Sequence, residues 1–96
     1  MQLKNKIALV TGASSGIGKA IAEKFASEGA LVILTSRNLD RLKEVENSIK
    51  KNNGKADSIV MDVTDREQVK NAVLGIIEKY KKIDVLVNNA GIARWG

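Results

Sequence analysis

Residues 11–18 read TGASSGIG, a glycine-rich segment between two regions of regular apolar patterning. It follows the apolar run KIALVT at residues 6–11, which has the Ile, Leu and Val content of a buried strand. After it, apolar residues recur on one face of a helix: Ile17, Ala20, Ile21 and Phe25. A glycine-rich turn between a buried strand and a helix is typical of α/β proteins that bind nucleotides.

Apolar patterning assigns the remaining elements. Further strands are expected over Ala30 to Ser36, Ser58 to Asp62 and Ile83 to Asn89. Helices are expected over Gly16 to Glu28, from Leu39 to a stop at Asn52-Asn53-Gly54, and after a capping box of Thr64 and Glu67. The apolar face of this last helix consists of Val69, Ala72, Val73, Ile76, Ile77 and Tyr80. Gly75 lies inside the same helix, where it costs about 1 kcal/mol relative to Ala.

The order of elements is therefore βαβαβαβ. Such alternation implies a parallel sheet with right-handed crossovers. In the doubly wound arrangement the strands are ordered 3-2-1-4, and ligands bind at the carboxyl ends of the strands. The sequence thus predicts an α/β, Rossmann-type unit of three layers, with residues 1–96 as one domain that ends after its fourth strand.

The amino-acid composition excludes several kinds of functional site. The 96 residues include no His and no Cys, which excludes a structural zinc site, a disulfide framework, a thiol nucleophile and a Ser-His-Asp triad. The net charge of +5 comes from basic residues spread along the chain, so most of them are expected on a solvated surface. With three scattered aromatic residues and no long apolar run, we expect neither nucleic acid nor a membrane as partner, and a cytoplasmic location.

The glycines of residues 11–18 have separate expected roles. Gly12 permits a sharp turn, Gly16 lets the backbone approach a pyrophosphate, and Gly18 allows the helix to pack closely on the strand. Free N–H groups at the helix N-terminus add phosphate donors, together with the hydroxyls of Ser14 and Ser15. A P-loop is excluded because Ala13 and Ala20 replace its first glycine and its Mg²⁺-binding hydroxyl. The remaining alternative to a phosphate-binding loop is that these glycines form only a tight turn, with no ligand bound.

The end of the second strand indicates which dinucleotide is bound. A site for NAD generally has Asp or Glu there to hold the ribose 2′-hydroxyl, whereas this chain has Ser36-Arg37. Arg37 can pair with a 2′-phosphate and stack beside adenine, and one such contact is worth about 1.5–3 kcal/mol. We therefore expect NADP rather than NAD, with a solvated surface arginine as the alternative. Asp40 is expected in the first turn of the following helix, where the dipole favours it.

Asn88-Asn89-Ala90-Gly91 follows the fourth strand, and with residues 11–18 it makes the whole chain resemble the short-chain dehydrogenase/reductase family. The nearest likeness is to 3-oxoacyl-(acyl-carrier-protein) reductases and related ketoreductases. The resemblance implies that the glycine loop holds the cofactor phosphates with Ile17 near the nicotinamide, that Asp62 and Val63 border the adenine, and that Asn88 ties the fourth strand to its neighbours. It also associates Arg37 with NADP, although Ser15 is neutral where many NADP-dependent members are basic.

The cofactor-binding residues expected from these arguments form one set, without a catalytic residue or a metal ligand. They are Gly12, Ser14, Ser15, Gly16, Ile17, Gly18, Arg37, Asp62, Val63, Asn89, Ala90 and Gly91. By the resemblance, Asn89, Ala90 and Gly91 would line the ribose and nicotinamide side.

The family's catalytic Tyr-x-x-x-Lys pair is missing. The one tyrosine, Tyr80, is followed four positions later by Asp84 and lies on an apolar helix face, so core packing is expected. The resemblance implies a longer NADP-dependent parent enzyme that transfers a hydride between NADPH and a ketone or secondary alcohol, of which this chain would be an inactive fragment. The alternative is a non-catalytic dinucleotide-binding or scaffold module that is complete at this length. The apolar edge at Val85, Leu86 and Val87 predicts that the isolated chain is either marginally stable or pairs with another copy through this edge, and a homo-oligomer is expected.

Overall fold

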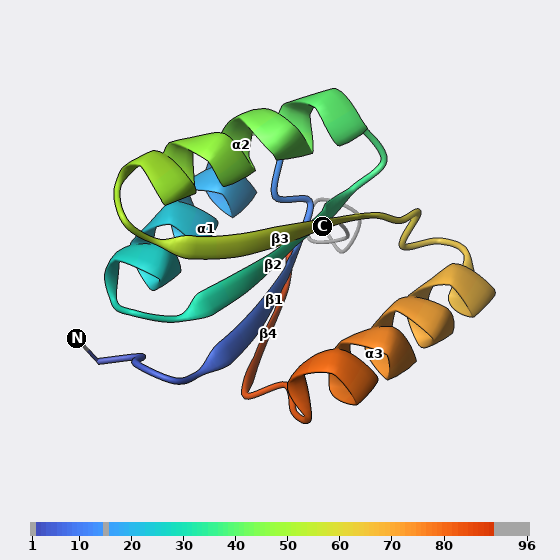
Figure 1. Cartoon of the computed structure of the whole chain (residues 1–96). Coiled ribbons are helices and arrows are strands. Elements are labelled where there is room, and N and C mark those ends of the chain that lie inside the picture. The colour runs from blue at the N-terminus through green and yellow to red at the C-terminus, as the bar shows by residue number, and fades with distance from the viewer. Residues whose placement is uncertain (1, 15, 90–96) are drawn as a thin grey trace.

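The structure is a computed structural model that describes residues 2–14 and 16–89, and its elements alternate between strand and helix (Figure 1). The strands are β1 (Ile7–Thr11), β2 (Leu31–Ser36), β3 (Lys55–Val60) and β4 (Val85–Asn88). The helices are α1 (Gly16–Ser27), α2 (Leu39–Lys51) and α3 (Arg66–Tyr80). All neighbouring strands pair in parallel in the order β3-β2-β1-β4, which confirms the predicted Rossmann-type order.

Helices α1 and α2 cover one face of the sheet and α3 covers the other, so the fold has three layers (Figure 1). Successive residues of a strand point to opposite faces. Accordingly, Ala8 and Val10 of β1 belong to a core with α1 and α2, whereas Leu9 packs with Ile76 of α3. Val32, Ile33 and Leu34 of β2 are completely buried, as expected for a strand covered on both faces.

The third strand lies earlier in the chain than the sequence predicts. It spans Lys55–Val60 rather than Ser58 to Asp62, so Asp62 belongs to the loop that follows. The N–H of Gly54 donates to the carbonyl of Ile49 at 2.8 Å, which closes α2 and lets the strand begin at the next residue. Since β3 is an edge strand in partial contact with solvent, its polar residues are tolerated and its apolar pattern is weak. The other predicted elements differ from the observed ones only at their ends.

The start of α3 also differs from the prediction. The capping box of Thr64 and Glu67 is wrong, because Asp65 is the N-cap and accepts from the N–H groups of Glu67 at 3.0 Å and Gln68 at 3.2 Å. Thr64 donates its hydroxyl to Asp62 at 2.7 Å instead. A carboxylate is favoured at this position because it accepts from the free N–H groups and because its negative charge is stabilised by the positive end of the helix dipole.

Helix α3 buries only part of its predicted apolar face. Ile76 is buried, and Val73 and Tyr80 pack beside it against the sheet. Ile77, predicted on the same face, is 42% exposed, and neighbouring Leu74 is 54% exposed. No helix among the described residues has the length and apolar character needed to cross a membrane.

Candidate functional site

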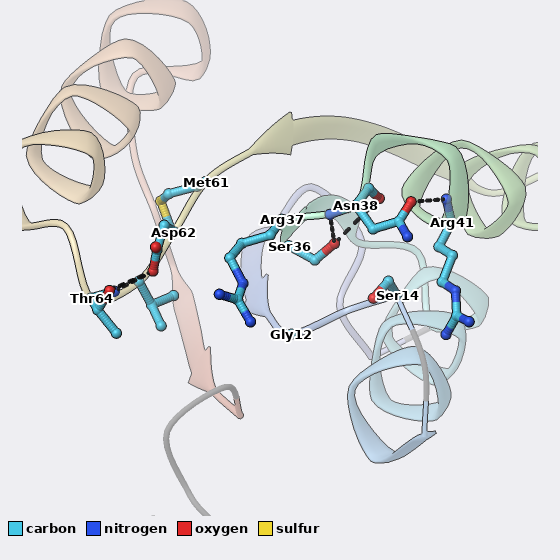
Figure 2. Close-up of a pocket in the computed structure, with 10 residues that line it drawn as sticks. Gly12, Ser14, Ser36, Arg37, Asn38, Arg41, Met61, Asp62 and Thr64 are labelled. Carbon is cyan, nitrogen blue, oxygen red and sulfur yellow. Dashed lines mark hydrogen bonds between the residues drawn. The ribbon is translucent and has the colours of Figure 1, made fainter.

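A pocket of about 370 Å³ lies where the chain leaves β1, β2 and β3 (Figure 2). This is the carboxyl edge of the sheet, where parallel α/β folds bind ligands. Predicted site residues in its lining are Gly12, Ser14, Arg37, Asp62 and Val63. Residues that the sequence did not identify also line it: Ser36, Asn38, Arg41, Met61 and Thr64.

The glycine loop has the geometry that its sequence predicts. Gly12 has φ of 62° and Gly16 has φ of 59°, values in the left-handed region that favours glycine. A Cβ on Gly18 would lie 2.1 Å from the carbonyl oxygen of Gly12, so α1 starts in direct contact with the turn. A Cβ on Gly16, by contrast, would meet nothing within 4 Å. The backbone at Gly16 therefore borders open space, which fits the approach of a phosphate group.

The turn after β2 is fixed by short hydrogen bonds. Ser36 Oγ accepts from the N–H of Asn38 at 3.1 Å, and Asn38 Oδ1 accepts from the N–H of Arg41 at 3.1 Å, which caps α2. Asp40 lies in the first turn of α2, as predicted. Arg37 is exposed and lines the pocket, so its guanidinium is available to a ligand.

The loop after β3 supplies the opposite wall of the pocket. Asp62 Oδ1 accepts from the N–H of Thr64 at 2.9 Å and from its hydroxyl at 2.7 Å. The N–H of Asp62 donates to Gln68 Oε1 at 2.9 Å, and the N–H of Met61 donates to the carbonyl of Ser36 at 2.9 Å. These bonds hold Asp62 beside the turn that carries Arg37.

Of the predicted site residues that the structure describes, Gly16, Ile17, Gly18 and Asn89 lie outside this lining. Asn89 Nδ2 donates to the carbonyl of Gly12 at 3.4 Å, which joins the end of β4 to the glycine loop. Asn88 Oδ1 accepts from Thr11 Oγ1 at 3.2 Å, so Asn88 does link β4 to β1 as expected. The side chain of Ile17 is 70% exposed at the start of α1. Ser15, Ala90 and Gly91 lie outside the described residues.

Arg41 was missed because its position in the apolar pattern of α2 is that of an ordinary solvent-facing residue. The available signal was its place in the first turn of that helix, where a cation opposes the dipole. Thr64 was missed because the pattern Thr-x-x-Glu was assigned to a cap. The pattern Asp62-x-Thr64, typical of a turn closed by a carboxylate, was the better signal.

Comparison with known proteins gives the family. The family model for short chain dehydrogenases matches residues 6–96. The chain belongs to this family. It is 52% identical, over 98% of its length, to the 3-oxoacyl-(acyl-carrier-protein) reductase FabG of Thermotoga maritima. The chain spans 38% of the length of that relative.

Solved short-chain dehydrogenase structures share the fold. A metagenomic short-chain oxidoreductase in complex with NADP superposes with a TM-score of 0.92 and 42% identity, covering 95% of this chain and 41% of that one. The L-sorbose reductase of Gluconobacter frateurii, complexed with NADPH and L-sorbose, gives a TM-score of 0.87 and 41% identity over 95% of this chain and 36% of that one. The resemblance expected from the glycine loop and residues 88–91 is thereby confirmed, and the family is one of oxidoreductases.

Tyr80 packs against the core, as the sequence predicts. Its hydroxyl donates to Asp57 Oδ2 at 2.8 Å, and Lys79 Nζ lies 3.2 Å from the same oxygen. Burial raises the pKa of Tyr80, and the hydrogen bond to Asp57 raises it further. Tyr80 lines a different pocket, with Lys6, Leu31 and Lys55 at the amino ends of the strands. It therefore lies at the opposite edge of the sheet from the glycine loop.

Proposed function

We propose that this chain binds NADP(H) across the carboxyl edge of its sheet, as the cofactor-binding part of an oxidoreductase that acts on a ketone or secondary alcohol. The observation that carries the proposal is that Arg37 lines the same pocket as Gly12 and Ser14. A guanidinium at the end of β2 suits a ribose 2′-phosphate, whereas the carboxylate typical of NAD sites would repel it. The NADP and NADPH complexes of two structural relatives support the same assignment.

The proposed contacts follow the course of an extended dinucleotide over the strand ends. The N–H groups at the start of α1, together with Ser14 and Ser15, bind the pyrophosphate where Gly16 leaves the backbone open. Asp62 and Val63 border the adenine, since both line the pocket next to Arg37. The nicotinamide side is assigned to Ile17, Asn89, Ala90 and Gly91.

Bound NADPH would supply the hydride, and the described residues supply binding and orientation. Tyr80, the one tyrosine of the chain, does not serve as the proton donor for the substrate oxygen, because its hydroxyl is bonded to Asp57 at the opposite edge of the sheet. We therefore propose that residues 1–96 form a single dinucleotide-binding domain and that hydride transfer belongs to the longer parent protein. The 38% share of the reductase relative that the chain spans supports this proposal. The chain alone should oxidise no NADPH in the presence of a ketone.

Calorimetric titration with NADP⁺ and NAD⁺ tests the choice of cofactor. The native chain should bind NADP⁺ more tightly, and Arg37→Asp should lower that affinity by roughly ten- to a hundredfold, because one charge-assisted contact is lost. Lys70→Asp is the matched control, since Lys70 is an exposed cation on α3, away from the pocket lining. Equal affinity of the folded native chain for both dinucleotides, or no binding of either, would contradict the proposal.

A further inference from the structure

A second guanidinium lies in the same pocket as Arg37. Arg41 is in the first turn of α2, where its N–H donates to the side chain of Asn38 at 3.1 Å. In Figure 2 the side chain of Arg41 extends from the start of α2 toward the level of Ser14 in the glycine loop. It lines the pocket with Arg37, and in the view of Figure 2 Ser14 lies between the two guanidinium groups.

The position of Arg41 is unfavourable unless an anion is present. A cation in the first turn of a helix opposes the positive end of the helix dipole. Among the described residues, neither Arg37 nor Arg41 has an ion pair that would neutralise its side chain. Asp40, the acidic residue of the same turn, forms no ion pair with them. The helix N-terminus and two guanidinium groups therefore give this end of the pocket a positive potential.

A phosphate monoester matches this arrangement. It carries nearly two negative charges at neutral pH and three acceptor oxygens, so two separate guanidinium groups can each pair with it. The glycine loop itself contributes no cation between Gly12 and Gly18, so a second positive charge has to come from another element. Ser36 is already bonded to both the N–H and the carbonyl of Asn38, and therefore shapes the turn.

We infer that Arg41 is a second specificity residue, which holds the 2′-phosphate of NADP(H) from the side opposite Arg37. This inference rests on the proposed function and assigns to that site a residue of α2 that the sequence did not indicate. The two arginines then share the discrimination between NADP and NAD, and neither alone accounts for it. Arg41 makes no contribution to NAD, which has a hydroxyl in place of the phosphate.

The test compares Arg41→Gln, Arg37→Gln and the double variant with the native chain. Titration calorimetry with NADP⁺, NAD⁺ and 2′,5′-ADP should show that Arg41→Gln weakens NADP⁺ and 2′,5′-ADP about tenfold and leaves NAD⁺ within about twofold. The double variant should bind NADP⁺ and NAD⁺ about equally. Lys51→Gln is the matched control, because it removes one exposed cation from the other end of α2. It should change neither affinity.

Thermal unfolding without ligand separates this role from a structural one. Removing a cation from the first turn of α2 should leave the melting temperature unchanged or raise it slightly, whereas loss of a structural contact would lower it. If Arg41→Gln leaves the ratio of NADP⁺ to NAD⁺ affinity unchanged while Arg37→Gln lowers it, the inference is overturned and the proposed function stands. If the native chain shows no preference for NADP⁺, the proposed function fails, and the inference with it.

Discussion

Two glycines inside helices should respond in opposite directions to the same substitution. In α1, a Cβ on Gly18 would lie 2.1 Å from the carbonyl oxygen of Gly12 and 2.8 Å from Asn89 Nδ2. Ordinary contacts of a Cβ atom lie at 3.4–4 Å, so the turn would have to move away from α1 by more than about 1 Å. The nearest atom belongs to the backbone, so no change of rotamer relieves the overlap. Overpacking of this kind costs typically about 1–3 kcal/mol.

In α3, a Cβ on Gly75 would meet nothing within 4 Å. Gly75→Ala therefore adds no overlap and removes the entropic disadvantage of glycine in a helix, which is worth about 1 kcal/mol. For a domain of this size, a gain of 1 kcal/mol raises the melting temperature by roughly 4–8 °C. The structure gives no packing reason for the glycine at this position.

Urea denaturation followed by circular dichroism measures both effects. Gly18→Ala should lower the free energy of unfolding, Gly75→Ala should raise it, and the double variant should equal the sum, because the two sites lie on opposite faces of the sheet. Because alanine gains about 1 kcal/mol over glycine in a helix at this position too, the net loss for Gly18→Ala is smaller than the overlap alone would give, and a variant more stable than the native chain would refute the close contact with the turn. A loss for Gly75→Ala would show that another surface covers this side of α3 in solution.

Three further predictions concern single side chains. Asp65→Ala should lower the free energy of unfolding by about 1 kcal/mol, because it removes the N-cap of α3, and Thr64→Ala should lower it by less. Equal losses for the two variants in urea denaturation would count against Asp65 as the cap. Burial raises the pKa of Glu46, but hydrogen bonds from Lys50, Ser58 and Lys43 outweigh it and hold the pKa below its usual 4.5. The ionised carboxylate therefore stabilises the fold fully above that value, and this stabilisation is lost as pH falls through the lower pKa of the folded state. The free energy of unfolding of Glu46→Gln should accordingly depend less on pH in this range than that of the native chain. Parallel pH profiles of the two free energies would contradict the reasoning. Tyr80→Phe should lower the free energy of unfolding by about 1 kcal/mol, because it removes the hydrogen bond to Asp57, and should leave the affinity for NADP⁺ unchanged. Weaker binding of NADP⁺ in calorimetric titration would place Tyr80 in the site.

The sequence predicts those parts of the fold in which local pattern and tertiary environment agree. β2 has a continuous apolar run because both faces of the strand are covered, so its pattern identifies it directly. β3 is different: its register is set by pairing with β2, from Leu31 opposite Lys55 to Ser36 opposite Val60. Its six residues, KADSIV, are three polar and three apolar ones without regular alternation, so the pairing with β2 and not the local pattern defines where the strand begins and ends.

The same distinction applies to the candidate site. Gly12 and Gly18 were predictable because a turn with positive φ and a close backbone contact both require glycine, whatever surrounds them. The place of Arg41 in the pocket depends on how α2 lies over the end of β2, which is a property of the assembled sheet. Thr64 likewise becomes part of the wall only because β3 ends at Val60 and leaves Asp62 in a loop.

The walls of the pocket and its charges are built in different ways, and this difference bears on selectivity. The glycine loop and the loop after β3 are held to β2 by backbone bonds, from Ala13 N–H to the Thr35 carbonyl at 3.0 Å and from Met61 N–H to the Ser36 carbonyl at 2.9 Å. These backbone contacts already form on folding, so ligand binding incurs no further entropy cost for making them. Arg37 and Arg41 are exposed and have no ion pair among the described residues, so each loses about 0.5–1.5 kcal/mol of side-chain entropy when it pairs with a phosphate. That loss offsets part of what a single charge-assisted contact contributes, so the second arginine that we propose would add to the discrimination between NADP and NAD.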